Sequence, residues 1–230
     1  HQEAVHDVKF SPDGKSLVTV SSDHTAKIWN LENKTLKTTL RGHRSGILSV
    51  NFSPDGKRFV TASWDNTARV WDMQTGNSQV LEGHQDTVWE AKFSPDGKRV
   101  VTYSEDNTAR IWDLKTQKSQ LIQGHQSGLT SADFSPDSQQ VITSGWDNTT
   151  RIWLLNGQQI AEYPGKGFAV NSQWTQVATV QEDNAFIPED AISIWRIDNI
   201  DNLLIRACQR LRFYLPYAPG LSDSDRALCD

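Results

Sequence analysis

The sequence predicts an all-β fold made of repeated four-stranded antiparallel sheets, and two repeated patterns predict it. In the first, a Ser-Pro-Asp turn is followed by a short apolar run and then by an Asp-Asn-Thr or Asp-His-Thr segment that ends in tryptophan. The turns start at Ser11, Ser53, Ser94 and Ser135 and the tryptophans are Trp29, Trp71, Trp112 and Trp153, a step of 41 or 42 residues. The second pattern is a Gly-His pair at the same interval, at 42–43, 83–84 and 124–125. Self-similarity at this period indicates an array of supersecondary units.

The first strand of each repeat has apolar residues spaced by three and then by two positions, as at Ile47, Val50 and Phe52. Strict alternation along a strand would space them by two and two. We therefore expect one extra residue, a β-bulge, near the start of this strand. The same spacing occurs at Val5, Val8 and Phe10, at Val88, Ala91 and Phe93, and at Leu129, Ala132 and Phe134.

The other elements of a repeat follow in a fixed order. Ser-Pro-Asp-Gly makes a turn in which Pro presets φ and Gly takes the fourth position, although Ser138 replaces this Gly in the fourth repeat. A β-rich run such as 59–61 predicts the second strand and 67–71 predicts the third, with a tight turn at Asp65-Asn66 between them. The polar stretch after the tryptophan ends in a short fourth strand before the next Gly-His pair.

Four-stranded sheets repeated with this period and with Gly-His and Trp-Asp marks resemble the WD40 family of β-propellers. The full dipeptide occurs at Trp71-Asp72 and Trp112-Asp113, whereas Trp29, Trp153 and Trp195 keep only the tryptophan. The resemblance covers residues 1–200. It implies propeller blades near 1–41, 42–82, 83–123, 124–163 and 164–200.

The fifth repeat departs from the pattern. Gly165-Lys166-Gly167 stands where a Gly-His pair should be, no Ser-Pro-Asp-Gly turn follows, and 184–189 reads as an insertion. We therefore expect a degenerate last blade. Only five blades are visible and the sequence starts inside a Gly-His pair, so a segment of a longer array is the preferred interpretation over a closed five-blade ring.

Residues 201–230 change from a period of two to a helical pattern and predict a C-terminal helical tail. Asp201-Asn202 offers an N-cap, and Pro216 and Pro219-Gly220 end the helix. The tail resembles the ending of large bacterial multidomain WD40 proteins, including signalling ATPases of the STAND type. Packing of the tail against the propeller is favoured over docking to a partner. Cys208 and Cys229 are expected to be buried thiols within it.

The composition narrows the functional classes. The chain has 230 residues, of which 37% are apolar and nine are tryptophan, and this composition fits a folded domain and excludes a disordered chain. Its formal net charge is −5. The acidic balance argues against a nucleic-acid or anionic-membrane partner, because both require a basic surface. The sequence contains no run of about 18 or more apolar residues, the length that a transmembrane helix requires. The two cysteines form no disulfide framework, so we expect a cytoplasmic protein, without cofactor or metal.

The resemblance implies that the His of Gly-His, a Thr of the second strand, the Asp of the following turn and the Trp of the third strand form a hydrogen-bonded tetrad. The implied sets are His43, Thr61, Asp65 and Trp71; His84, Thr102, Asp106 and Trp112; His125, Thr143, Asp147 and Trp153; and His1, Thr19, Asp23 and Trp29. A hydroxyl, an imidazole and a carboxylate also make a nucleophilic triad. An enzyme needs one such site, whereas this chain repeats it four times, so a structural role is favoured.

Two further groups of polar residues have structural interpretations. Lys27, Arg69, Arg110 and Arg151 each lie two residues before the third-strand tryptophan. They could form a basic ring for an anion, but their regular recurrence favours packing between neighbouring blades. His6 and His24 fall outside the tetrads and have no acidic or thiol neighbours at ligand spacing, so we expect surface residues rather than metal ligands.

The tryptophans outside the tetrads carry the functional hypothesis. Trp64 and Trp146 precede the tetrad Asp in their turns, a position that in WD40 propellers lies on the top face near the central channel. Trp89 follows the expected bulge, where the other repeats carry His6, Leu48 and Thr130. These slots vary while the framework beside them repeats, and exposed aromatic residues are typical of protein-binding surfaces. The predicted partner-binding residues are Trp64, Trp89, Trp146, Glu105, His6 and Leu48.

The sequence therefore predicts a non-catalytic protein-interaction scaffold or sensor module of a bacterial signalling protein. Its partner would be a protein or peptide on the top face, with upstream domains of the same protein as one candidate. One alternative is a propeller enzyme that uses the central channel, which would need convergent acids and a ligand-sized cavity. Another is a purely structural repeat array. In that case Trp64 and Trp146 would merely cover blade edges.

Overall fold

The computed structural model describes residues 1–180 and 192–197. The expected insertion at 184–189 and the expected helical tail at 201–230, with Cys208 and Cys229, lie outside the described residues. Within the described part all regular elements are β-strands, arranged in separate antiparallel sheets in which each strand pairs with its neighbour in sequence. The predicted all-β architecture of four-stranded antiparallel sheets is therefore confirmed.

Five sheets follow one another along the chain. The first contains β1 (Val5–Phe10), β2 (Ser16–Ser21), β3 (Thr25–Asn30) and β4 (Thr35–Arg41); the second contains β5 (Ile47–Phe52), β6 (Arg58–Ser63), β7 (Thr67–Asp72) and β8 (Ser78–Glu82). The third contains β9 (Val88–Phe93), β10 (Arg99–Ser104), β11 (Thr108–Asp113) and β12 (Ser119–Gln123); the fourth contains β13 (Leu129–Phe134), β14 (Gln140–Gly145), β15 (Thr149–Leu154) and β16 (Gln159–Pro164). The described strands of the fifth are β17 (Lys166–Val170), β18 (Gln176–Val180) and β19 (Ile192–Arg196).

The bulge predicted for the first strand is present in every sheet. In the second sheet Ile47 pairs with Ser63 but Ser49 pairs with Ala62, so one residue of β5 has no partner on β6. Equivalent register shifts occur in the other four sheets. The bulge explains the apolar spacing of three and two, because it returns the next apolar side chain to the buried face.

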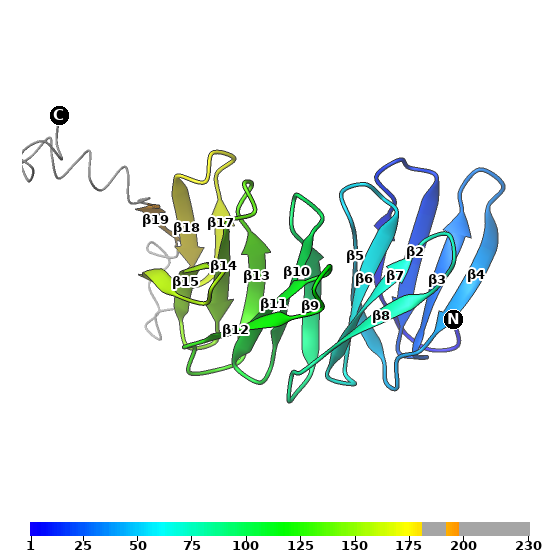
Figure 1. The fold of residues 1–230 in the computed structure, drawn as a ribbon, viewed down its shortest axis with the longest axis horizontal. Helices are drawn as coiled ribbons and strands as arrows, with labels where there is room; N and C mark the ends of the chain where they lie inside the picture. Colours follow the sequence, from blue (N-terminus) through cyan, green and yellow to red (C-terminus); the bar gives the residue numbers. More distant parts are fainter. Residues whose placement is uncertain (181–191, 198–230) are drawn as a thin grey trace, which may run out of the picture.

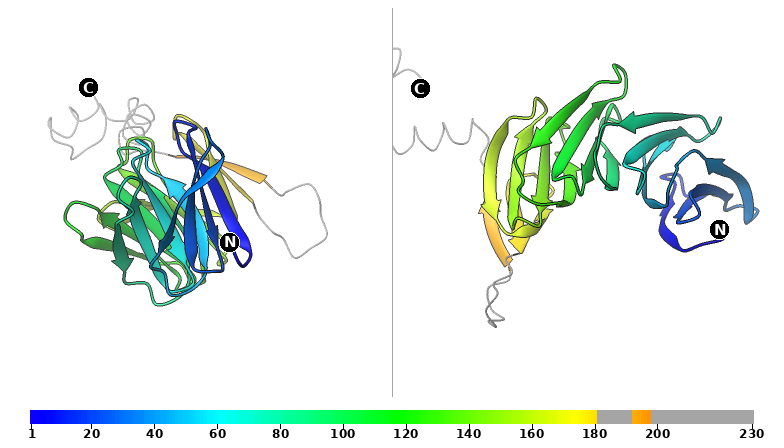
Figure 2. Two further views of the ribbon diagram at one scale, coloured as in Figure 1. Left: turned by 90° about the vertical axis from the view of Figure 1, so that its right-hand side faces the viewer. Right: turned by 90° about the horizontal axis from the view of Figure 1, so that it is seen from below.

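The sheets stand side by side (Figure 1), and the view from below in Figure 2 shows them along an open arc with the first and fifth sheets at opposite ends. The first strands of successive sheets adjoin one another. Hydrogen bonds also cross between sheets: the backbone N–H of Val50 donates to Asp7 (3.0 Å), and Asn51 Nδ2 donates to the carbonyl of Ala91 (2.9 Å).

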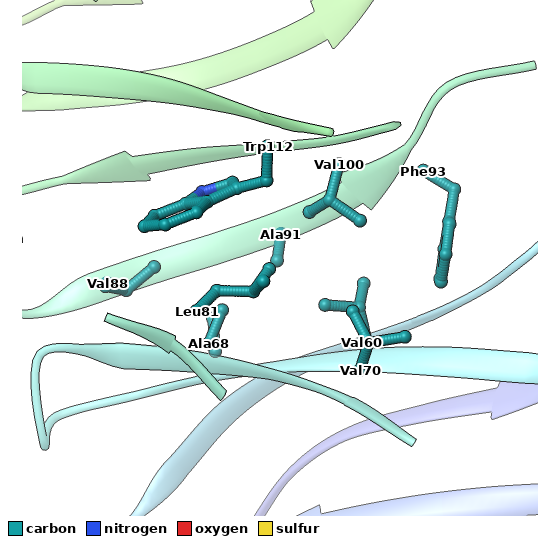
Figure 3. Packing of buried hydrophobic residues seen from close by; sticks show 10 residues of the cluster. Val60, Ala68, Val70, Leu81, Val88, Ala91, Phe93, Val100 and Trp112 are labelled. Atoms are coloured by element: carbon teal, nitrogen blue, oxygen red, sulfur yellow. The ribbon is translucent and has the colours of Figure 1, made fainter. Parts of the chain in front are cut away.

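The core lies between the sheets, where aliphatic side chains of one sheet meet the first strand and the tryptophan of the next. Figure 3 shows Val60, Val70 and Leu81 of the second sheet against Val88 and Trp112 of the third. Each fully buried aliphatic side chain of this kind contributes roughly 1.5–3 kcal/mol. At the outer side of the first sheet the equivalent positions are open, so that Val5, Val8 and Phe10 are 52%, 49% and 67% exposed.

The turns follow the predicted chemistry. Ser53 Oγ donates to Asp55 Oδ1 (2.6 Å), and the backbone N–H of Gly56 donates to the carbonyl of Ser53 (2.9 Å). Gly56 has a φ of 67°, in the left-handed region that favours glycine. Ser138 adopts the same conformation in the fourth sheet, with a φ of 61°, and its hydroxyl accepts a hydrogen bond from the N–H of Asp96 (3.2 Å).

Candidate functional site

In the second sheet the structure brings His43, Thr61, Asp65 and Trp71 together as a chain of hydrogen bonds. The indole N–H of Trp71 can only donate, and it donates to Thr61 Oγ1 (2.9 Å). In a neutral ring, Nε2 of His43 accepts from the Thr61 hydroxyl (2.8 Å), and the imidazole proton lies on Nδ1, because the facing carboxylate of Asp65 can only accept. That proton is donated to Asp65 Oδ2 (2.8 Å). This order of donors and acceptors corresponds to the Nδ1–H tautomer of a neutral imidazole.

The electrostatics agree with a neutral imidazole and an ionised carboxylate. Burial lowers the pKa of His43 and outweighs the opposing effect of Asp65. Burial alone would raise the pKa of Asp65, but hydrogen bonds from His43, from Thr67 and from the backbone N–H of Arg44 hold that pKa far below its usual range. The pKa of Asp106 is depressed in the same way.

The other predicted tetrads have the same geometry. In the third sheet His84 joins Asp106 (2.8 Å) and Thr102 (2.7 Å). In the fourth, His125 joins Asp147 (3.0 Å) and Thr143 (2.8 Å). In the first, His1 joins Asp23 (3.0 Å) and Thr19 (2.8 Å). Trp29, Trp112 and Trp153 each donate to the Thr of their own set.

The tetrads are unsuited to nucleophilic chemistry. The Thr61 side chain is completely buried and its hydroxyl lies between an indole donor and an imidazole acceptor, so no substrate atom can reach it. The carboxylate of Asp65 is engaged by the turn and by the preceding loop. In the part of the chain that the structure describes, no group of three or more His, Cys, Asp or Glu side chains could hold a metal ion.

Three of the four basic residues before the tryptophans, Arg69, Arg110 and Arg151, contact residues of their own sheets, whereas packing between neighbouring blades was expected. Arg69 lies over the ring of Trp71 (5.9 Å to the centroid), and its Nη1 donates to Ser78 Oγ (3.1 Å). Arg110 does the same over Trp112. A Cβ at Gly42 would lie 2.9 Å from Arg69 Nη1, which explains why glycine precedes the tetrad histidine.

The top face is defined here as the edge of the sheets that carries the turns at 22–24, 64–66, 105–107 and 146–148 and the first residues of β1, β5, β9 and β13. All six predicted partner-binding residues belong to it. Trp64, Trp89 and Trp146 are 43%, 39% and 58% exposed, whereas Trp71, Trp112 and Trp153 are buried.

Trp64 is positioned by a glycine that the sequence interpretation missed. A Cβ at Gly46 would lie 2.7 Å from Trp64 Cε3, so the absence of a side chain at Gly46 lets the indole lie across the loop. His6 meets the ring of Trp64 edge to face, with centroids 5.3 Å apart. Glycine also stands at the equivalent position Gly128, but a Cβ there would meet Glu105 of the preceding sheet, so the repeat pattern alone does not reveal the contact with Trp64.

Trp89 and Trp146 have polar neighbours. The indole N–H of Trp89 donates to Glu105 Oε2 (2.7 Å), which joins two predicted residues directly. Lys166 Nζ lies 4.4 Å from the ring centroid of Trp146. Lys166 occupies the place of the tetrad histidine in the fifth repeat, and its side chain lies on the top face beside Trp146 of the fourth sheet.

A cavity of about 420 Å³ lies among these residues, lined by His6, Leu48, Trp89, Tyr103, Leu129, Thr130 and Trp146. Four of the six predicted residues line it, and the other two touch it indirectly, Trp64 through His6 and Glu105 through Trp89. Tyr103, Leu129 and Thr130 were missed. Thr130 shares the variable slot of Trp89, so the repeat alignment could have found it; the strand-borne Tyr103 and Leu129 carry no comparable signal.

Comparisons with known proteins agree with this geometry. Residues 4–201 match the family model described as the IFT122 first beta-propeller. A stretch of 47 residues is 40% identical to U3 small nucleolar RNA-associated protein 13 of Saccharomyces cerevisiae and covers 20% of this chain and 6% of that protein. A stretch of 49 residues is 45% identical to protein transport protein SEC13 of Kluyveromyces lactis, with 20% of this chain and 16% of that protein covered. The chain thus spans only a small part of these two relatives.

Proposed function

Because the chain belongs to the β-propeller family described as the IFT122 first beta-propeller and carries WD40-type repeats, we propose that it is a non-catalytic scaffold that binds a protein or peptide on its top face. The family assignment supports a protein-interaction scaffold in general. The choice of the top face as the binding surface is this proposal's own contribution, and it rests on the exposed tryptophans.

The observation that carries the proposal is the contrast between two sets of tryptophans. A third-strand tryptophan recurs in every full repeat, and it is buried at Trp71, Trp112 and Trp153 and partly buried at Trp29. In contrast, Trp64, Trp89 and Trp146 occupy slots that hold tryptophan only in some repeats, and they are exposed. Large exposed rings gathered on one face are typical of interaction sites, and buried aromatic anchors dominate the binding energy of interfaces. A repeated framework that presents non-repeated aromatic residues fits recognition better than structural support.

The two alternatives have specific weaknesses. An enzyme that used this cavity would need acids or nucleophiles converging on it, and among its lining residues only His6 and Tyr103 are titratable. A purely structural array would give the variable tryptophans neighbours that bury them, yet Trp146 is 58% exposed.

The test removes the aromatic anchors. Peptides selected from a display library against the chain would be measured by titration calorimetry with the wild type and with Trp64→Ala/Trp146→Ala. We expect affinity to fall more than about tenfold, because each anchor contributes about 2 kcal/mol when buried at an interface centre. We also expect the thermal midpoint to change little, because the ring of Trp146 is mostly exposed.

The matched control is Val80→Ala/Leu121→Ala, which removes side chains that are 42% and 36% exposed on the outer strands β8 and β12. Binding should be unchanged in this variant. A large loss of stability in the tryptophan variant, with affinity intact after correction for the folded fraction, would contradict the proposal.

The wider setting is a separate part of the proposal: a sensing or scaffolding module of a cytoplasmic bacterial signalling protein of the STAND type. It is supported by the resemblance of the 201–230 sequence to the ends of such proteins. Sequencing the coding region on both sides of this segment tests it. A nucleotide-binding ATPase domain in the same reading frame is the expected result, and its absence would contradict the STAND setting.

A further inference from the structure

We infer that the cavity lined by Trp89, Tyr103 and Trp146 receives a cationic side chain of the partner, a lysine ammonium or an arginine guanidinium. The inference deepens the proposed function and rests on it. It names the chemistry of the group that enters the top-face cavity, and its test separates a failure of that chemistry from a failure of the binding face.

The lining of the cavity is largely aromatic. Three aromatic side chains from the third and fourth sheets border one space, and the face of an aromatic ring carries negative electrostatic potential that attracts cations. Burial, and the neighbouring Glu90, raise the pKa of Tyr103, so its ring stays neutral and its hydroxyl donates to Glu90 Oε2 (3.4 Å). None of the residues that line the cavity is lysine or arginine, and the imidazole of His6 is the one basic side chain of its lining.

The rim of the cavity also carries a hydrogen-bond acceptor that suits an ammonium or a guanidinium. Glu105 accepts the indole proton of Trp89 through Oε2 (2.7 Å), and its side chain is otherwise exposed at the rim. The carboxylate lies over Gly128, where a Cβ would be only 3.1–3.2 Å from it, so glycine there leaves room for the acid.

An ammonium carries three N–H donors and a guanidinium five, and neither accepts hydrogen bonds. A cationic side chain that enters the cavity can therefore pair with Glu105 at the rim while its aliphatic stem covers Leu48. A purely aliphatic side chain would leave that carboxylate without a charged partner.

The ammonium of Lys166 already lies at the rim of the cavity, against Trp146. Lys166 Nζ lies 4.4 Å from the centroid of Trp146, within the distance at which a cation is attracted to an indole face. The indole of Trp146 thus stabilises a cation supplied by the chain itself. The remaining exposed surface of this ring, together with Trp89, can do the same for a cation supplied by a partner.

The test uses small probes and the indole N–H resonances of the whole protein in 15N-labelled form, assigned with single Trp→Phe variants. Nα-acetyl-lysine amide and Nα-acetyl-arginine amide are titrated into the protein, with Nα-acetyl-norleucine amide as the uncharged isostere. We expect the basic probes to shift the resonances of Trp89 and Trp146 but not that of buried Trp71, and the norleucine probe to shift them less at equal concentration.

The matched variant is Glu105→Gln, which keeps an acceptor for the Trp89 indole but removes the charge. We expect it to weaken the basic probes about fivefold. Glu32→Gln, at an exposed position in the turn between β3 and β4, is the charge-matched control and should change nothing. Equal shifts from norleucine, or no shift at Trp89 and Trp146, would overturn the inference.

Peptide selection separates the two proposals. Selected peptides that lack basic residues but lose affinity with Trp64→Ala/Trp146→Ala would overturn the cationic ligand and leave the proposed binding face standing. If the basic probes bind the cavity but the double variant retains full affinity for selected peptides, the cation site stands and the proposed binding face is wrong.

Discussion

The second and fifth sheets show what the tetrad contributes, because one has it complete and the other has lost its histidine. In the second sheet the chain of hydrogen bonds runs from Trp71 through Thr61 and His43 to Asp65. In the fifth, Trp195 still donates to Thr179 (2.9 Å), but the Thr179 hydroxyl donates to the carbonyl of Pro164 (2.6 Å). The bond between the second and third strands therefore survives without the imidazole.

This difference between the second and fifth sheets shows that the tetrad has two structural roles. The indole–threonine bond holds the third strand against the second, and a backbone carbonyl can replace the histidine as acceptor. The imidazole–carboxylate bond fixes the turn against the loop that enters the sheet, and it requires a histidine. Where Lys166 replaces that histidine, its side chain lies on the top face against Trp146. The residue at the histidine position of the fifth repeat thus belongs to the candidate binding surface.

The largest expected difference between the two sheets is in the burial of their tryptophans. Trp71 is 2% exposed and packs in the core between the first and second sheets, so Trp71→Ala should lower the free energy of unfolding by about 3–5 kcal/mol. Trp195 is only partly buried, and Trp195→Ala should cost less, about 1–2 kcal/mol. Urea unfolding followed by circular dichroism measures both. Equal losses of unfolding free energy in the two variants would contradict the expected difference between the second and fifth sheets.

The next effect concerns the imidazole–carboxylate bond. His43→Ala and Asp65→Ala should each lower the free energy of unfolding by about 1–3 kcal/mol, because each leaves a buried polar partner unsatisfied. The double variant should lose less than the sum of the two. Simple additivity in this double-mutant cycle would mean that the two side chains do not act as a unit.

Acidification should weaken the complete sheets more than the fifth. The pKa values of His43 and His125 are lowered in the folded state, mainly by burial, so the unfolded chain binds more protons and stability falls as pH drops through about 6.5. The depressed pKa values of Asp65 and Asp106 give a further loss below about pH 4. Urea unfolding at pH 7, 5.5, 4 and 3 measures the trend. Asp65→Asn should flatten the low-pH part, and stability that does not fall on acidification would contradict the assigned protonation states.

The smallest effect is in the turns. Gly56 and Trp174 occupy equivalent turn positions, with φ of 67° and 54°. Glycine adopts this backbone conformation without strain, whereas Trp174 is strained there because it carries a Cβ. Gly56→Ala should cost about 1 kcal/mol. Trp174→Gly should change the free energy of unfolding by less than about 1 kcal/mol, because relief of the left-handed backbone offsets the lost contacts of a partly buried ring. Thermal unfolding of both variants tests this, and a large loss for Trp174→Gly would show that the ring dominates.

Much of this fold could be predicted from the sequence because its determinants are local and repeated. The spacing of Ile47, Val50 and Phe52 predicted the bulge, and the Ser-Pro-Asp-Gly turns predicted the hairpins. The tetrad partners could be named from matched offsets within one repeat and the family resemblance. Each of these features depends on hydrogen bonds or side-chain periodicity within about 40 residues.

The sequence by itself determined the sheets and their turns, since a period of two and a left-handed turn position act on neighbouring residues, and its repeated motifs named the polar chains of the first four sheets through the family resemblance. Only the tertiary structure decided that Arg69 lies over Trp71, that Gly46 admits the ring of Trp64, and that Trp89, Thr130 and Trp146 border one cavity. These contacts join loops and strands that local spacing does not relate, and those around the cavity cross from one sheet to the next. They depend on the angle at which successive sheets pack, which is set by the summed shapes of the core side chains rather than by any single motif.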